Sequence, residues 1–264
     1  MKAEELPAFF DELERWAAER DGAAELVEYG DHADQVIELR RSSTRAQPLA
    51  IVLHGGFWRA GFTRRNTTAL AVALADAGWA SANVEYRRLG PGAYGPMLDD
   101  VAEARRRLDG FRPVVAVGHS AGGHLALWLG AERLVDACVA LGGMCDLARA
   151  AEAELGAGAV HEFLGGSPQE VPDAYLAADP GARLPLRVPQ LLVHGTQDDR
   201  VPLSHVRAYA IRARAAGDDC RLVELDAGHF EPIDPRSRTW PEVLGAIQAA
   251  GTAADGALVP GAAP

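Results

Sequence analysis

The sequence PVVAVGHSAGG, residues 113–123, carries the strongest structural signal in this chain. Its apolar first part, Pro113 to Val117, predicts a strand buried on both faces, and the residues from His124 to Glu132 have helical spacing. A very tight turn between strand and helix forces its central residue, Ser120, into a strained conformation, which the glycines two positions to either side permit. We therefore expect Ser120 to stand above a sheet, and the N–H of Ala121, at the start of the helix, to point to a site where negative charge develops.

Short apolar runs lie on both sides of this segment, and segments with helical spacing separate most of them. The other runs cover residues 26–29, 35–39, 49–53, 80–84, 138–141, 190–193 and 220–225, and the helical segments include 67–77, 97–108 and 204–216. The first two runs alternate and favour an antiparallel pair, whereas several later runs are unbroken, as is typical of strands in a parallel sheet. The pattern predicts an α/β fold with a mostly parallel, eight-stranded sheet flanked by helices.

The organisation of the chain predicts one domain over residues 1–248. Apolar side chains at helical spacing predict a helix over residues 4–20 that packs at the domain edge and covers either the entrance to the site or one edge of the sheet. Residues 147–184 interrupt the alternation with several glycines and a proline, which indicates a small insertion of short helices and makes it the candidate lid. Residues 249–264 mix Ala, Gly and Pro without periodicity, which predicts a disordered tail.

Charge and cysteine content exclude several kinds of partner. A net charge of -11 disfavours a nucleic-acid backbone or an anionic membrane surface as a partner. The chain begins with acidic residues rather than a signal peptide, and no apolar run approaches the length of about 18 residues that a membrane helix needs. Its three cysteines form no metal-ligand set and suit a reducing compartment. We expect a cytoplasmic protein without cofactor or metal, and a homo-oligomer remains open.

A second glycine-containing loop, His54-Gly55-Gly56-Phe57-Trp58, follows the run at 49–53. Together with residues 118–122, this loop resembles the esterase and lipase branch of the α/β-hydrolase superfamily, which keeps an oxyanion donor at this place. The resemblance implies that the N–H groups of Gly56 and Phe57 join that of Ala121, and that His54 is structural. Phe57 stands where the family motif has a third glycine, so the two amides that face the oxyanion stay open.

The form His-Gly-Gly-aromatic-Trp is also similar to the kynurenine formamidase group within that branch. Trp58 is therefore a candidate for lining the substrate pocket, with packing beneath the loop as the alternative. His119, inside the turn at Ser120, is a second candidate for substrate contact, and packing or exposure to solvent is again the alternative.

A serine nucleophile of this kind needs a general base and a carboxylate that orients the base. The segment Gly195-Thr196-Gln197-Asp198-Asp199-Arg200-Val201-Pro202 resembles the family's acid loop, which places Asp198 at the acid position, with Asp199 as the alternative. His229 follows the last apolar run in a Gly-His pair, as the family's catalytic histidine does. The resemblance therefore implies a triad of Ser120, Asp198 and His229.

These residues predict a serine hydrolase that cleaves small soluble carboxylic esters through an acyl-enzyme intermediate. An amide hydrolase of the arylformamidase or small peptidase type is the alternative, since it uses the same groups. A third reading is an acyltransferase or a binding protein on the same fold. An intact triad argues against a pure binding protein, because binding does not require all three groups.

Overall fold

The computed structural model describes all residues except 2, 21, 23, 42–47 and 259–264. Its centre is a single sheet in the order β1-β2-β4-β3-β5-β6-β7-β8, in which β1, β2 and β4 pair antiparallel and all other neighbours pair parallel. The strands are β1 (Glu25–Glu28), β2 (Val36–Arg40), β3 (Leu49–Leu53), β4 (Ala80–Val84), β5 (Val114–His119), β6 (Ala137–Leu141), β7 (Gln190–Gly195) and β8 (Cys220–Leu225). The mostly parallel, eight-stranded sheet expected from the sequence is confirmed.

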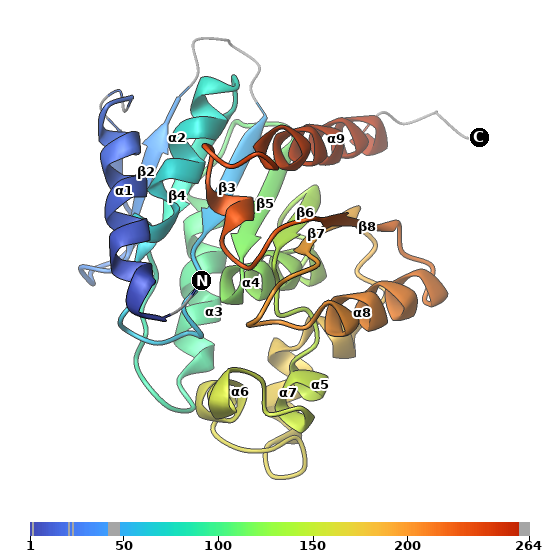
Figure 1. Ribbon diagram of the computed structural model, residues 1–264. Coiled ribbons are helices and arrows are strands. Elements are labelled where there is room, and N and C mark those ends of the chain that lie inside the picture. Colours follow the sequence, from blue (N-terminus) through green and yellow to red (C-terminus); the bar gives the residue numbers. More distant parts are fainter. Residues whose placement is uncertain (2, 21, 23, 42–47, 259–264) are drawn as a thin grey trace.

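Helices cover both faces of this sheet (Figure 1). They are α1 (Leu6–Ala18), α2 (Thr68–Asp76), α3 (Tyr94–Arg106), α4 (Ala121–Ala131), α5 (Leu147–Glu152), α6 (Leu155–Leu164), α7 (Pro172–Ala178), α8 (Leu203–Ala215) and α9 (Trp240–Leu258). Short 3-10 helices are η1 (Ala3–Glu5), η2 (Arg64–Thr67), η3 (Pro180–Arg183) and η4 (Glu231–Ile233). Within the described residues, no helix combines the length and the apolar composition needed to span a lipid bilayer.

The central strands are apolar throughout because each of their faces packs on a separate core. In β3, Ala50 and Val52 belong to the core formed with α2 and α9, whereas Leu49, Ile51 and Leu53 belong to the core formed with α3, α4 and α8. Side chains alternate between the two faces of a strand, so a run of five apolar residues supplies both cores at once. The strands thereby hold their carboxyl ends rigidly, and loops that follow them carry Ser120 and His229.

The C-terminal segment differs from the sequence-based expectation. Helix α9 continues to Leu258, so the predicted disorder from residue 249 is wrong for 249–258, and 259–264 lie outside the described residues. Ala250 and Ala254 are buried in the core beside α2 and α9, and a Cβ atom at Gly251 would lie 2.7 Å from the indole of Trp79. Small residues therefore let the helix approach the body of the protein, and this tertiary packing explains the order of an Ala- and Gly-rich segment.

Candidate active site

The turn from β5 into α4 holds Ser120 at φ 54° and ψ −115°, a backbone conformation that residues with side chains rarely adopt. The two flanking glycines make this turn possible. A Cβ atom at Gly118 would lie 1.9 Å from the carbonyl oxygen of Gly122, and one at Gly122 would lie 2.1 Å from the carbonyl oxygen of Leu53. The backbone N–H of Ser120 donates to Leu141 over 2.9 Å, which fixes the turn to the neighbouring strand β6. The strand, turn and helix occur as expected from the sequence.

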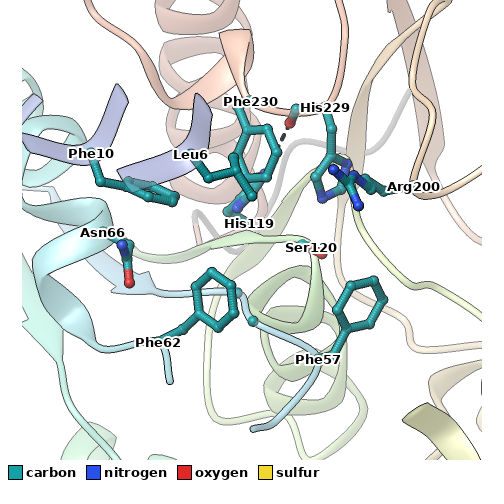
Figure 2. Close-up of a pocket in the computed structure, with 12 residues that line it drawn as sticks. Leu6, Phe10, Phe57, Phe62, Asn66, His119, Ser120, Arg200, His229 and Phe230 are labelled. Carbon is teal, nitrogen blue, oxygen red and sulfur yellow. Dashed lines mark hydrogen bonds between the residues drawn. The ribbon is translucent and has the colours of Figure 1, made fainter. Parts of the chain in front are cut away.

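The loops after β7 and β8 bring an acid and an imidazole together. The Nδ1–H of His229 donates to Oδ2 of Asp198 over 2.7 Å, although the two residues are 31 positions apart in the sequence. With the proton on Nδ1, the lone pair on Nε2 is available to accept a proton. Figure 2 shows the His229 ring next to Ser120 in one pocket, which both residues line. The structure therefore brings the three sequence-predicted residues into one site.

The carboxylate of Asp198 is fully buried, and both of its oxygens accept hydrogen bonds. Oδ1 accepts the backbone N–H groups of Arg200 and Val201, each over 2.8 Å, and Oδ2 faces His229. Burial by itself raises the pKa of this carboxyl, but the hydrogen bond and charge of His229 and the two backbone N–H groups outweigh it and lower the pKa. Asp199, the alternative acid, is 55% exposed and lies near Arg200 and the N-terminal amine instead.

Two further histidines support this arrangement. His194, at the end of β7, lies with its Nε2 2.8 Å from the carbonyl oxygen of Val201 and 3.4 Å from Oδ2 of Asp198. His119 lies with its Nε2 3.0 Å from the carbonyl oxygen of His229. Burial lowers the pKa of both imidazoles, to about 3 for His119, so both are neutral at pH 7 and donate through Nε2. His119 also lines the pocket, and its hydrogen bond holds the loop that carries His229.

The loop after β3 adopts three successive positive φ angles, 114° at Gly56, 53° at Phe57 and 59° at Trp58. Within the described part of the chain, no acceptor takes a hydrogen bond from the N–H of Gly56, Phe57 or Ala121. A Cβ atom at Gly55 would lie 2.9 Å from Cβ of Ser120, so this loop runs directly against the serine. Unpaired backbone N–H groups beside a serine hydroxyl can stabilise a developing oxyanion.

A buried polar cluster holds this loop from below, and no motif in the sequence predicted it. Oε1 of Glu85 lies 3.0 Å from Nε2 of His54, and the hydroxyl of Tyr86 donates to the carbonyl oxygen of His54 over 2.7 Å. The other oxygen of Glu85 accepts the backbone N–H of Arg64 over 3.0 Å, and Arg88 forms an ion pair with the same carboxylate. Although burial raises the pKa of Glu85, the hydrogen bond and charge of His54 outweigh it and lower the pKa to about 2. Glu85 directly follows β4 at the carboxyl edge of the sheet, and this position was the feature of the sequence that could have indicated its role.

Trp58 does not face the pocket that contains Ser120. Its indole stacks on Phe163 with ring centres 4.5 Å apart, and its Nε1–H donates to Nδ1 of His124 over 3.3 Å. Only 6% of Trp58 is exposed, at a neighbouring cavity. The candidate role of Trp58 in lining the substrate pocket is corrected to packing beneath the loop, because the indole packs on Phe163 and His124.

The pocket at Ser120 has a cavity volume of about 80 Å³, and four of its twelve lining residues are phenylalanines. Helix α1 forms one wall, where the ring of Phe10 packs edge-on against Phe230 with centres 5.8 Å apart (Figure 2). The lining residues are Leu6, Phe10, Gly55, Gly56, Phe57, Phe62, Asn66, His119, Ser120, Arg200, His229 and Phe230. None of these belongs to the candidate lid at 147–184, which instead approaches Phe57 from outside at Gly156. Helix α1, which the sequence placed at the domain edge, therefore covers one side of this pocket.

Comparison with known proteins agrees with this geometry. The model of the BD-FAE family matches residues 37–210. The chain belongs to the BD-FAE family. The matched region contains the loop after β3, the turn at Ser120 and Asp198, while His229 lies beyond it.

The chain is also similar to several proteins that are described as esterases. The chain is 29% identical to esterase LipC of Mycobacterium tuberculosis over 253 residues, which cover 81% of this chain and 61% of LipC. Among solved structures, esterase B from Lactobacillus rhamnosis has a TM-score of 0.74 at 19% identity, with 96% of this chain and 94% of that chain covered. Esterase Est2 of Thermogutta terrifontis has a TM-score of 0.68 at 21% identity, with 91% and 95% covered. The expected α/β-hydrolase fold of the esterase and lipase type is confirmed, whereas the formamidase similarity stays a prediction.

Proposed function

We propose that this chain is a serine carboxylesterase that hydrolyses small carboxylic esters through an acyl-enzyme intermediate at Ser120. The observation that carries the proposal is the meeting of a strained serine turn with a buried Asp198–His229 pair in one pocket. The names of the relatives support it, since LipC and the similar structures are described as esterases. One structure of esterase B holds a tributyrin phosphonate inhibitor, and one of Est2 is phosphoramylated by tabun.

In the proposed reaction, Oγ of Ser120 attacks the ester carbonyl while Nε2 of His229 takes the hydroxyl proton. The resulting imidazolium is stabilised by the carboxylate of Asp198, which is already ionised because its pKa is lowered. His229 then gives the proton to the leaving alcohol, and the acyl group stays on Ser120. A water molecule, deprotonated by His229, attacks the acyl enzyme, releases the acid and restores the serine.

The tetrahedral intermediates carry a negative oxygen, for which we propose the amides of Gly56, Phe57 and Ala121 as donors. These N–H groups have no acceptor within the described residues, so they are available without breaking a hydrogen bond. The amide of Ala121 also lies at the N-terminus of α4, where the helix dipole favours negative charge. A single donor of this kind typically contributes about 10²–10³ in kcat.

The size of the pocket supports substrates with a small acyl group. A cavity of about 80 Å³ holds roughly five to eight water molecules, since each water needs roughly 10–15 Å³ of such space. Its walls include Phe10, Phe62 and Phe230, which would contact an apolar substrate but leave little length for a long chain.

Hydrolysis of 4-nitrophenyl acetate by the purified protein tests the proposed function. We expect turnover by the wild type and a loss of about four decades in kcat for Ser120→Ala. Ser204→Ala is a matched control, because Ser204 is exposed on α8 and does not line the pocket. The proposal fails if the wild type hydrolyses no ester, or if Ser120→Ala retains more than about a tenth of the activity with unchanged circular dichroism.

The proposal includes a reducing, cytoplasmic location for the enzyme. It is supported by Cys138, Cys145 and Cys220, which are all buried and unpaired. Cell fractionation with an antibody against the chain tests it, and recovery from an extracellular fraction would contradict it.

A further inference from the structure

Arg200 places a permanent positive charge in the wall of the pocket at Ser120. Its backbone N–H holds Asp198, but its side chain turns into the pocket, where Figure 2 shows it beside His229 and away from Leu6 and Phe10. The other lining residues include no aspartate, glutamate or lysine and no second arginine. An arginine in such a wall is a specific site for an anionic group.

The guanidinium of Arg200 is only partly occupied by protein partners. Nη2 donates to the carbonyl oxygen of Met1 over 3.3 Å, and Nε lies 3.4 Å from Asp199 without forming a hydrogen bond. These are its side-chain partners within the part of the chain that the structure describes, although a guanidinium has five N–H donors. The side chain of Arg200 is 30% exposed, whereas the paired Asp199 is 55% exposed and well hydrated. Donors therefore remain for a carboxylate of the substrate.

The position of Arg200 indicates which part of the substrate carries that carboxylate. In ester hydrolysis the leaving oxygen must lie next to His229, because this imidazole supplies its proton. Arg200 flanks His229, so it lies on the leaving-group side of the scissile bond, while Phe10 and Phe62 lie on the other side (Figure 2).

We propose that Arg200 binds a carboxylate on the alcohol part of the substrate, so that the preferred substrates are short-chain esters of hydroxy acids. This inference rests on the proposed esterase function and specifies its substrate class. The net charge of -11 would repel such anions over most of the protein surface. A guanidinium in the pocket wall offsets that repulsion where the reaction takes place.

The test compares two acetyl esters that differ in one charge, 4-acetoxybenzoate and its methyl ester. Values of kcat/KM are measured for the wild type, Arg200→Met and Arg207→Met, and the anionic-to-neutral ratio is compared between proteins. Arg200→Met removes the charge but keeps the apolar stem and the backbone N–H that holds Asp198. Arg207 is the matched control, because it is exposed on α8, is paired with Glu224 and lies outside the pocket.

We expect the ratio to fall about tenfold in Arg200→Met, as the loss of one charge-assisted contact implies, and to stay unchanged in Arg207→Met. Asp199→Asn removes the competing carboxylate and should raise the ratio about twofold. An equal loss for both esters in Arg200→Met would show a structural role in the acid loop, and an unchanged ratio would also overturn the proposal. Hydrolysis of the methyl ester by the wild type separates these outcomes from a failure of the esterase function itself, in which neither ester is turned over.

Discussion

The Nε2–H of His119 donates to the backbone carbonyl of His229 over 3.0 Å, and thereby joins the residue before Ser120 to the loop that carries the imidazole. We predict that His119→Phe keeps the fold but lowers kcat about 10- to 100-fold, because an untied loop misplaces His229. Steady-state kinetics with 4-nitrophenyl acetate measure this effect. His119→Gln, which keeps a side-chain N–H, should recover part of the loss. A rise in KM with unchanged kcat would instead assign His119 to substrate binding.

Variants of Asp198 and Asp199 test which of the two carboxylates orients His229. Asp198→Asn should lower kcat by about 10³–10⁴, because His229 loses both its fixed tautomer and its counter-charge. Asp199→Asn should change the hydrolysis of a neutral ester by less than about threefold, since Asp199 is 55% exposed and pairs at the surface. A larger loss in the Asp199 variant would reverse the assignment.

Variants of Glu85 test the role of the buried polar cluster beneath the loop after β3. Glu85→Gln removes the charge that faces His54 and Arg88, so we expect kcat to fall about tenfold and the free energy of unfolding to fall by about 3 kcal/mol. Glu38→Gln is the control, because Glu38 also pairs with Arg64 but does not contact His54. Kinetics and urea unfolding of both variants give the comparison. Equal effects in the two variants would show that Glu85 has no particular role under the loop.

Acid should destabilise the protein through buried neutral histidines such as His205. Burial lowers the pKa of His205 to about 4 from its usual 6.5, with Asp146, Arg149 and His194 as the titratable neighbours, and its Nε2 has no hydrogen-bond partner within the described residues. Below pH 6.5 the unfolded chain binds a proton that the folded chain does not bind until about pH 4. This contribution to stability is therefore present above pH 6.5 and is lost as the pH falls toward 4.

His205→Met removes that titration, so its unfolding free energy should fall by about 2 kcal/mol less than that of the wild type between pH 7 and pH 4.5. Urea unfolding at the two pH values measures the difference. His32→Gln, a change of an exposed histidine, serves as the control. The same fall in His205→Met and in the wild type would contradict the assignment.

The choice between an ester and a formamide is tested by kcat/KM for an aryl acetate and for N-formylkynurenine. We expect the acetate to be preferred, and long-chain triglyceride emulsions to be poor substrates because the cavity is small and aromatic. A clear preference for the formamide would favour the arylformamidase alternative instead. Efficient hydrolysis of the emulsions would contradict both readings.

The sequence predicted the elements that depend on local pattern. The sheet was predicted because its strands are apolar runs that fill two cores. The turn at Ser120 was predicted because it requires glycines at fixed spacing. The pairing of Asp198 with His229 was also expected, because the two segments resemble the family's acid loop and histidine loop, and in the structure each residue follows a strand at the same edge of the sheet.

Residues that act through contacts distant in sequence were not found in this way. Glu85 contacts His54, which is 31 positions away in the sequence, and no spacing pattern in the chain predicts this pair. The order of 249–258 depends on Trp79, which packs against Gly251 from a distant part of the chain. Arg200 stood inside the quoted acid motif, but only the structure shows that its side chain enters the pocket.

Chemical labelling tests most directly whether Ser120 is the nucleophile. The purified protein is treated with a fluorophosphonate, digested and analysed by peptide mass spectrometry. We expect one phosphonate per chain on Ser120, and no labelling of Ser120→Ala. Stoichiometric labelling of another residue, or unchanged labelling of the Ser120→Ala variant, would contradict it.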